Sequence, residues 1–551
     1  MNNRFIKLLL HYGLIQFGIV AIIIDLIYPH IYDGIWDPLV GFIFRLFDRT
    51  GKSKAEAYCL IFILMAIWIF AYFIFLRQRL YRDKTGRSFS YDNGRYNRSY
   101  WELIEYFKDA EPQRMEMNEL PDITWHKSRG IIMGKCGSKL ISFEPERNGT
   151  VVFAWGAPGV GKTKCVIVPS ARQWGLTVIR DKETGKRKTV QRGSVMVLDL
   201  KGDIYEANKD FRRIKRFSTI HVEDSYHYDP LITARSMDEE DLPEFFDNLA
   251  VTLVPDEAGA DAAYFIKVAR GFFTAIFLFC LHEDIERSFS DICLDITTHT
   301  YSEWGQRIEE SGYLPSMKYS NRFKDENPKN VGGGYSKLCD SLLLYTSSTM
   351  KRLLINDRKC ISPEDLEHCQ DIYIQVDPIK MDVYAPLVAM LFQVFMSAAL
   401  QRKEGSNPPI AYIIDEFGQL PRMPVIQKSA MLMRAYNASI LISTQAMASI
   451  DQHYGQDGRK LLMDCAKAHC FLSINDPDTR DWASRLIGTH KVLKVGFSQN
   501  YNTEETNSKS ITEIREKIFE PEAFSLLPDD HSVIIWKSGH FIKGETCYYK
   551  S

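Results

Sequence analysis

The feature that most constrains the fold of this chain is a glycine-rich segment directly after a short apolar run. Val151–Trp155 is apolar and partly β-branched, and the segment after it fits the pattern G-x-x-x-x-G-K-T. This segment consists of Gly156, Ala157, Pro158, Gly159, Val160, Gly161, Lys162 and Thr163. Its small residues let consecutive backbone N–H groups close around phosphates. The sequence therefore predicts a nucleotide-binding strand, loop and helix, in which Lys162 contacts the β- and γ-phosphates and Thr163 coordinates Mg²⁺.

Two later apolar runs end in acidic residues that could complete this site. Ser194–Leu198 is followed by Asp199, and Ala411–Ile414 is followed by Asp415 and Glu416. Only the second run ends in two adjacent acids, which can divide the work of the site between them. We therefore favour Asp415 as the Mg²⁺ ligand and Glu416 as the residue that polarises the attacking water.

Two more residues are candidates for contacting the phosphates. Gln445 ends the apolar run that begins at Ser439, and its amide could hydrogen-bond to the γ-phosphate. Arg434 follows helical apolar spacing at 426–433 and could reach a phosphate across a subunit boundary. On spacing alone, a solvated arginine and a loop-capping glutamine are the simpler interpretations, so both alternatives stay open.

Two N-terminal segments are long and apolar enough to span a membrane. At about 1.5 Å per residue, Leu8–Tyr28 would extend about 31 Å as a helix, and Ala57–Leu76 contains no charged residue. Basic residues follow the second segment, at Arg77, Arg79, Arg82, Lys84 and Arg87. Because positive charge favours the cytoplasmic side, we expect a two-helix anchor over 1–80, with both termini in the cytoplasm and a short loop across the membrane. The later apolar stretches Phe272–Leu281 and Pro386–Leu400 are expected to be core helices.

Charge and cysteine placement narrow the choice of ligands. Lys and Arg number 68 against 70 Asp and Glu, so any polyanion must bind a local patch. One candidate is Ile179–Arg192, expected to be an exposed basic hairpin that either meets DNA phosphate or anionic lipid, or is a solvated insertion. Cys465, His469 and Cys470 lack a fourth nearby ligand, so we favour core or surface positions over a metal site.

Taken together, these segments resemble the TraG/TraD-type coupling proteins of bacterial type IV secretion and conjugation. The resemblance rests on the glycine-rich loop, Asp199-Leu200-Lys201-Gly202-Asp203, Asp415-Glu416-Phe417-Gly418, Arg434 and Ser443-Thr444-Gln445, behind two N-terminal spans. It extends to Asp229-Pro230-Leu231, to 131–135 ahead of the loop, and to Leu526-Leu527-Pro528-Asp529 with strands around 533–536. The resemblance covers nearly the whole chain.

The resemblance implies an α/β fold, in which a RecA-like P-loop NTPase domain is interrupted by an all-helical domain and preceded by the transmembrane anchor. The first part of the nucleotide-binding domain, with a basic juxtamembrane linker, would occupy 81–231, the helical domain 232–345 and the second part 346–551. Helical apolar spacing at Phe265–Ile276 agrees with the insertion, and a loop is expected at Asn327–Gly334.

The resemblance also implies cofactors, roles and partners. The implied roles are ATP and Mg²⁺ binding for Lys162 and Thr163, a Walker B pair for Asp415 and Glu416, an arginine finger in a neighbour's site for Arg434, and coupling of the γ-phosphate to movement for Gln445. The implied assembly is a homo-hexamer around a channel in the bacterial inner membrane. Its implied partners are single-stranded DNA, relaxase or effector proteins, the channel components and ATPases of the secretion system, and membrane lipid.

Two features differ from the family pattern. Asp203 stands where members commonly have Glu, so the acid that ends the Asp199–Asp203 motif is one methylene shorter. The sequence also ends at Ser551 without the long or acidic tail through which some relatives recruit partners.

A membrane-anchored P-loop protein could belong to several classes of function, which the sequence motifs distinguish. We favour an ATPase that recruits a DNA–protein substrate, the relaxosome, and drives or gates its transfer into a secretion channel. The alternative is a nucleotide-switched docking receptor for protein effectors with little or no DNA pumping. A membrane-bound protease would need H-E-x-x-H, and the nearest string, His282–Glu286, lacks the second histidine.

Overall fold

The computed structural model describes residues 129–136, 139–143, 151–180, 187–257, 260–498, 508–537 and 540–547. All of them belong to the second of two units of the chain, 85–551. The predicted anchor at 1–80, with its spans at 8–28 and 57–76, lies outside the described residues, as does the basic segment that follows it.

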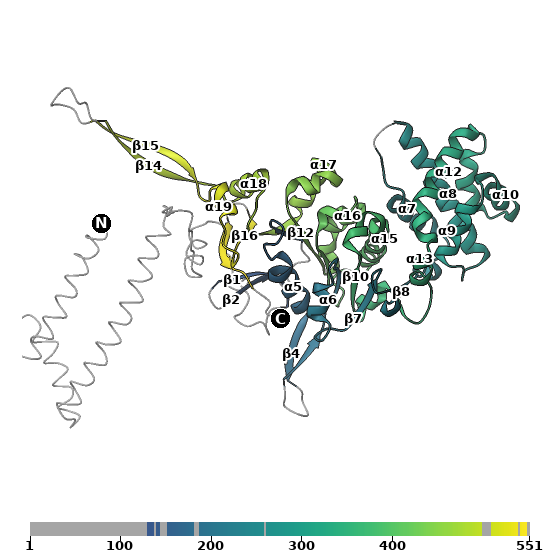
Figure 1. Ribbon diagram of the computed structural model, residues 1–551, viewed down its shortest axis with the longest axis horizontal. Helices are drawn as coiled ribbons and strands as arrows, with labels where there is room; N and C mark the ends of the chain where they lie inside the picture. Colours follow the sequence, from purple (N-terminus) through teal and green to yellow (C-terminus); the bar gives the residue numbers. More distant parts are fainter. Residues whose placement is uncertain are drawn as a thin grey trace, which may run out of the picture. The chain divides into compact units, whose positions relative to one another are not determined.

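An 11-stranded sheet has the strand order β2-β1-β17-β16-β13-β3-β12-β11-β6-β10-β7 (Figure 1). The strands from β13 to β7 are parallel, whereas β16, β17, β1 and β2 extend one edge in antiparallel fashion. The strands are β1 (Ile131–Cys136), β2 (Lys139–Phe143), β3 (Val151–Trp155), β6 (Ser194–Leu198), β7 (Ile214–Ser218), β10 (Asp371–Gln375), β11 (Ile410–Ile414), β12 (Ala438–Thr444), β13 (Ala466–Phe471), β16 (His531–Lys537) and β17 (His540–Glu545). Parallel strands are buried on both faces and therefore consist of continuous apolar residues. This is why β3, β6 and β11 could be predicted from the sequence.

Helices cover both faces of the sheet. Alternate residues of each strand point to opposite faces, and in the parallel strands both sets are apolar, so both faces must be buried. In β3, Val152 and Ala154 pack into one core, and Phe153 and Trp155 pack into the other. The helices of the first layer are η3 (Thr163–Ile167), α5 (Val168–Gln173) and α6 (Asp203–Asn208). Those of the second layer are α15 (Met381–Leu400), α16 (Pro424–Leu432), α17 (Met447–Asp464) and α18 (Pro477–Ile487). This three-layer arrangement confirms the predicted α/β class.

A run of helices lies between β8 (His227–Tyr228) and β9 (Cys360–Ile361) in the sequence. These two short strands pair in parallel, with His227 opposite Cys360, so the chain returns beside the point where it left. The helices between them are α7 (Leu242–Leu253), α8 (Ala260–Glu283), α9 (Phe289–Thr298), α10 (Tyr301–Ser311), α11 (Leu314–Ser320), α12 (Pro328–Leu342) and α13 (Ser348–Leu353). The exact limits of a separate helical domain, 232 and 345, stay a prediction.

Two described helices are long and apolar enough to cross a membrane, at Ala262–Glu283 and Pro378–Leu400. However, 72% and 67% of their apolar windows are buried inside the protein. The first packs against α7, α11 and α12, and the second packs against α7 and α16. Both are therefore core helices, as the sequence predicted.

The prediction of a loop at Asn327–Gly334 was wrong, because this segment forms the first half of α12. The Asn327 side chain caps the helix by accepting a hydrogen bond from Lys329 N at 3.0 Å. The glycines then allow α12 to approach α8 closely. A Cβ on Gly334 would lie 2.5 Å from Val268 Cβ, and a Cβ on Gly333 would lie 2.9 Å from Phe265 Cε1.

Two hairpins stand apart from the main sheet (Figure 1). β4 (Leu176–Arg180) pairs with β5 (Arg187–Gln191), which confirms a hairpin in the predicted basic segment, although its tip at 181–186 lies outside the described residues. β14 (Thr489–Ser498) pairs with β15 (Ser508–Lys517) just before α19 (Pro521–Ser525). This second hairpin was not predicted from the sequence.

The close contact of α8 and α12 can be tested with two glycine variants. We expect Gly334→Ala to destabilise the chain by about 1–3 kcal/mol, because its Cβ would overlap Val268 and push the helices apart. Gly332→Ala is the control, since its Cβ would meet only Tyr301 Cε1 at 3.7 Å. That variant should gain about 0.5–1 kcal/mol from helix propensity. Thermal unfolding of the purified chain measures both, and equal melting temperatures would contradict the close-packing account.

Candidate functional site

The carboxyl ends of β3, β12, β11 and β6 lie side by side at one edge of the sheet. Trp155 pairs with Thr444, and Ile414 pairs with both Ile442 and Leu198. The residues that follow these strands are therefore brought together, although they are far apart in the sequence. This edge holds the glycine-rich loop, Asp199, Asp415, Glu416 and Gln445.

The glycine-rich loop has the backbone conformation that its sequence predicts. Gly159 and Gly161 have φ angles of 80° and 92°, which residues with a Cβ rarely adopt. A Cβ on Gly156 would lie 2.7 Å from Val160 Cγ2, so the loop can curve this tightly only with glycine there. These glycines keep the backbone N–H groups accessible to phosphate oxygens.

Hydrogen bonds fix the loop to the neighbouring strand ends and to Lys162. Gly156 N–H donates to Thr444 O at 3.2 Å, and Ala157 N–H donates to Ser473 O at 2.8 Å. Lys162 Nζ donates to the carbonyls of Gly156 and Ala157, at 2.7 and 3.2 Å. The ammonium group is thus held inside the loop.

Thr163 joins the loop to the acidic pair. Its Oγ1 donates to Asp415 Oδ2 at 2.8 Å. Burial raises the pKa of Asp415, and the hydrogen bond from Thr163 opposes that shift. Burial lowers the pKa of Lys162, whereas the charges of Glu416 and Asp415 oppose the decrease. A hydroxyl and a carboxylate oxygen at this distance fit the oxygen ligands that Mg²⁺ prefers.

Glu416 and Gln445 interact directly. Gln445 Nε2 donates to Glu416 Oε2 at 3.0 Å, and the Glu416 N–H donates to Asp415 Oδ1 at 3.1 Å. Glu416 has φ 55° and ψ 47°, a left-handed conformation that costs a residue with a Cβ on the order of 1 kcal/mol. At this residue the chain turns away from the direction of β11, which places the Glu416 carboxylate within hydrogen-bonding distance of Gln445. A contact of Gln445 with phosphate stays a prediction.

Arg434 lies in η10 (Met433–Tyr436), a short 3-10 helix after α16, and its side chain is exposed. Across the described ranges, Arg434 forms no hydrogen bond or ion pair, and none joins it to the glycine-rich loop of its own chain. Its role at a neighbour's site therefore stays a prediction.

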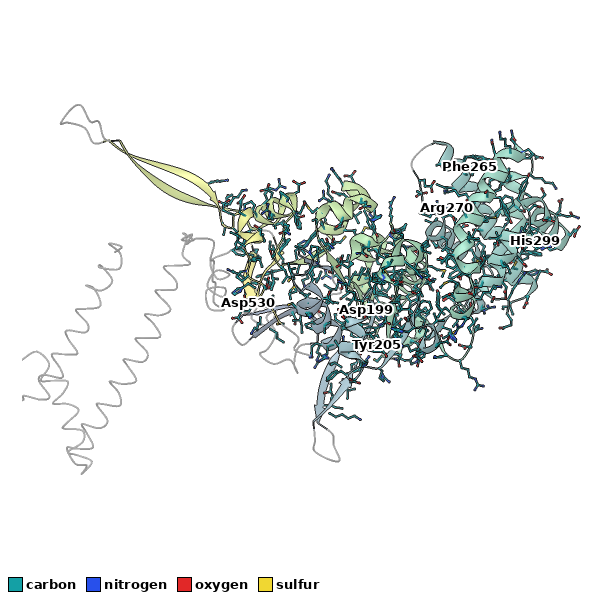
Figure 2. All side chains as sticks on the ribbon, in the orientation of Figure 1. Asp199, Tyr205, Phe265, Arg270, His299 and Asp530 are labelled. Atoms are coloured by element: carbon teal, nitrogen blue, oxygen red, sulfur yellow. The ribbon has the colours of Figure 1, made fainter. Side chains whose placement is uncertain are left out.

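Asp199, the other acidic candidate, supports its own loop. Its carboxylate accepts hydrogen bonds from Gly202 N at 2.9 Å and Tyr205 N at 2.7 Å, at the start of α6 (Figure 2). Burial raises the pKa of Asp199 to about 6, against the opposite effect of these donors. Both carboxylate oxygens of Asp199 thus stabilise the turn into α6. Asp415 as the Mg²⁺ ligand stays a prediction.

His469 has a packing role. It precedes Cys470 on β13, so the two side chains point to opposite faces of the sheet. His469 Nδ1 accepts a hydrogen bond from Trp155 Nε1 at 3.2 Å, and burial lowers the pKa of His469 to about 3. Among the residues that the structure describes, no cluster of three or more His, Cys, Asp or Glu side chains could hold a metal ion. The burial of His469 and Cys470 agrees with the core interpretation.

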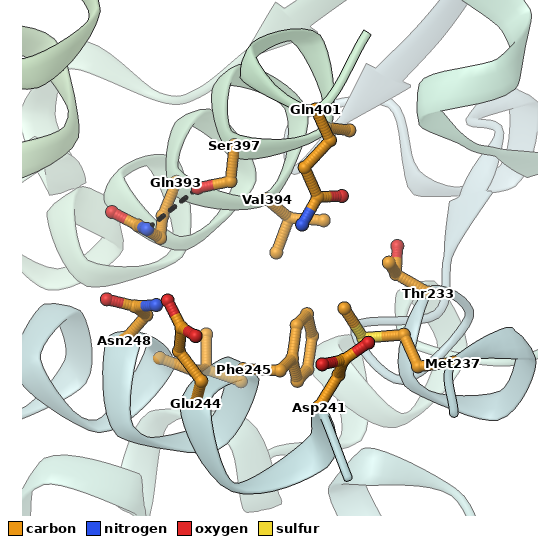
Figure 3. Close-up of a pocket in the computed structure, with 12 residues that line it drawn as sticks. Thr233, Met237, Asp241, Glu244, Phe245, Asn248, Gln393, Val394, Ser397 and Gln401 are labelled. Atoms are coloured by element: carbon orange, nitrogen blue, oxygen red, sulfur yellow. Dashed lines mark hydrogen bonds between the residues drawn. The ribbon is translucent and has the colours of Figure 1, made fainter. Parts of the chain in front are cut away.

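A cavity of about 170 Å³ lies between α7 and α15 (Figure 3). Asp241 and Glu244 line one wall, and Gln393 and Ser397 line the other, where Gln393 Nε2 donates to Ser397 Oγ at 3.0 Å. None of the residues predicted for the nucleotide site lines this cavity. The cavity is therefore separate from the edge of the sheet that holds the glycine-rich loop.

Two hydrogen bonds, from Gln445 to Glu416 and from Trp155 to His469, were not predicted from the sequence. Gln445 and Glu416 each follow a parallel strand, β12 and β11, so the strand register could have placed them together. The left-handed backbone of Glu416 carries no comparable signal, because glutamate is not typical of that conformation. The hydrogen bond from Trp155 to His469 likewise depends on the pairing of β3 with β13, which no motif marks.

Comparisons with known proteins identify the family of this chain. A family model for type IV secretory system conjugative DNA transfer matches residues 189–551. The protein VirD4 of Rhizobium radiobacter is 24% identical over 377 residues, which are 65% of this chain and 54% of that protein. The chain spans about half the length of the curated relatives that it matches.

Solved structures show the same fold. The plasmid coupling protein TrwB in complex with the ATP analogue ADPNP has a TM-score of 0.58 at 13% identity, over 83% of this chain and 95% of that one. TrwB in complex with ADP and Mg²⁺ has a TM-score of 0.57 at 14% identity, over 77% of this chain and 90% of that one. These similarities confirm the predicted RecA-like P-loop fold.

Backbone strain at Glu416 can be measured with two variants that both lack the carboxylate. We expect Glu416→Gly to be more stable than Glu416→Ala by about 0.5–1 kcal/mol, because glycine adopts the left-handed backbone without a steric cost. Both variants lose the hydrogen bond from Gln445, so their difference reports the backbone alone. Thermal unfolding measures it, and a lower melting temperature for the glycine variant would refute the strain.

Proposed function

Because the chain belongs to the type IV secretory system conjugative DNA transfer family, we propose that it is an inner-membrane ATPase that couples a DNA–protein substrate to a secretion channel. It would recruit the relaxosome and drive or gate its transfer by hydrolysing ATP. The observation that carries this proposal is the hydrogen bond of 2.8 Å between Thr163 and Asp415, which unites the P-loop with a buried acid.

The residues of this edge would divide the reaction between them. Bound ATP would supply the phosphoryl group, and bound Mg²⁺ would supply the cation that offsets the negative charge of the phosphates. Backbone N–H groups of Gly156–Thr163 and the Lys162 ammonium would bind the phosphates. Thr163 and Asp415 would hold the metal, and the Glu416 carboxylate would orient the attacking water and accept its proton.

Gln445 and Arg434 would connect this chemistry to assembly and movement. Gln445 is bonded to Glu416, so a γ-phosphate that competes for either group would shift the end of β12. Arg434 is exposed, which suits a residue that completes the site of a neighbouring subunit in a homo-hexamer. This arrangement would make hydrolysis depend on subunit contact.

Membrane location and partners complete the proposal. The apolar segments 8–28 and 57–76 would anchor the chain through two spans, with both termini cytoplasmic. Single-stranded DNA, relaxase or effector proteins, the secretion channel with its ATPases, and membrane lipid are the proposed partners.

A subunit-mixing experiment tests the shared active site. We expect Lys162→Ala and Arg434→Ala each to lower steady-state ATP hydrolysis by the detergent-solubilised full-length chain at least about 100-fold, as for loss of a phosphate-binding or transition-state cation. Mixing the two variants should restore part of the activity, because some interfaces then pair an intact Lys162 with a neighbour's intact Arg434. Lys428→Ala removes an exposed cation from α16 and should leave the rate unchanged.

Two outcomes would count against the proposal. A mixture no more active than its components would refute the arginine role across subunits. Nucleotide binding without turnover, with or without single-stranded DNA, would instead favour the nucleotide-switched docking receptor. Rates that rise with DNA and with protein concentration would support an assembling motor.

A further inference from the structure

The motif Asp199-Leu200-Lys201-Gly202-Asp203 has no role in the site described so far. It follows β6, which pairs in parallel with β11 in such a register that Leu198 lies opposite Ile414. Asp199 and Asp415 are therefore the first residues past two adjacent strand ends, about 4.8 Å apart in the direction across the sheet. The motif thus leaves the sheet beside the acidic pair.

Hydrogen bonds hold the backbone of this motif in one shape. The carboxylate of Asp199 accepts from Gly202 N at 2.9 Å and from Tyr205 N at 2.7 Å. Gly202 has a φ of 81°, so the chain can turn sharply there into α6. Asp203 is the first residue of α6, where an acid stabilises the helix N-terminus. Lys201 is held at the tip of this turn.

The Lys201 side chain is available to bind an anion. It is exposed, and within the described part of the chain it forms no ion pair or hydrogen bond. Burial lowers the pKa of Lys162, and the positive charge of Lys201 adds to this decrease. Lys162, in contrast, donates to the carbonyls of Gly156 and Ala157.

The direction of a bound nucleotide follows from the positions of these groups. The P-loop would surround the β-phosphate of a bound nucleotide, and Thr163 and Asp415 would hold the Mg²⁺ that offsets the charge of its phosphates. Because Thr163 ends the P-loop and Asp415 follows β11, the terminal phosphate would extend from β3 toward β11, and β6 is the next strand in that direction. Lys201, in the turn after β6, would then be on the side of the terminal phosphate.

We propose that Lys201 binds the terminal phosphate of a nucleoside triphosphate, as a second cation beside Lys162. This inference rests on the proposed ATPase function and deepens it. A diphosphate lacks the group that Lys201 would contact, so Lys201 would help the protein to distinguish the triphosphate from the diphosphate. The rigid turn around Asp199 would hold the lysine in place for this contact.

The test compares the affinities of the full-length detergent-solubilised chain for ADP and for a non-hydrolysable ATP analogue, both with Mg²⁺. Lys201→Ala should weaken binding of the analogue about tenfold or more and change ADP binding less than about twofold, as for loss of one charge-assisted hydrogen bond. Lys201→Arg should keep most of the affinity for the analogue. Lys209→Ala removes an exposed lysine paired with Glu206 just after α6 and should change neither affinity.

Each other result overturns the inference in a recognisable way. Equal weakening of both nucleotides would show that the substitution disrupts the turn. Unchanged nucleotide affinities would remove Lys201 from the site, and a simultaneous loss of DNA affinity would assign it to DNA phosphate instead. If the unsubstituted chain binds neither nucleotide, the proposed ATPase function itself fails, which is distinct from failure of Lys201 alone.

Discussion

The hydrogen bond between Thr163 and Asp415 is the interaction on which the nucleotide edge depends, and it joins positions 252 residues apart in the sequence. It can form only because β12 alone separates β3 from β11, and because all three strands are parallel and in register. Asp415 is buried, and an unpaired buried carboxylate is costly. The strand order therefore brings Thr163 and Asp415 together, and the hydrogen bond between them offsets part of the cost of burying the carboxylate.

Several polar groups at this edge already have partners within the chain. Lys162 is bonded to loop carbonyls and Gln445 to Glu416. A phosphate group that replaced such a bond would gain only modestly from the exchange, on the order of 1 kcal/mol. Under the proposed function, exposed groups that give up no existing bond would therefore contribute most to selectivity among nucleotides.

The sequence predicted those parts of the candidate site in which the polar residues directly follow a recognisable apolar strand. The P-loop and the Asp415-Glu416 pair each follow a continuous apolar strand, so pattern and function mark the same residues. It did not reveal features that depend on distant contacts. Gly333 and Gly334 are typical of a loop, yet contact with α8 makes them helical. The left-handed Glu416 and its bond to Gln445 depend on strand order, which short motifs do not encode.

The parallel pairing of β8 with β9 has a consequence for how such a chain can change over generations. Because His227 lies opposite Cys360, the helices between them begin and end at neighbouring points. The entropic cost of closing a loop rises only slowly with its length, so helices can be added, lost or replaced between these two points without altering the strand register. The helices between β8 and β9 can therefore diversify in number and sequence while the 11-stranded sheet keeps its strand order and register.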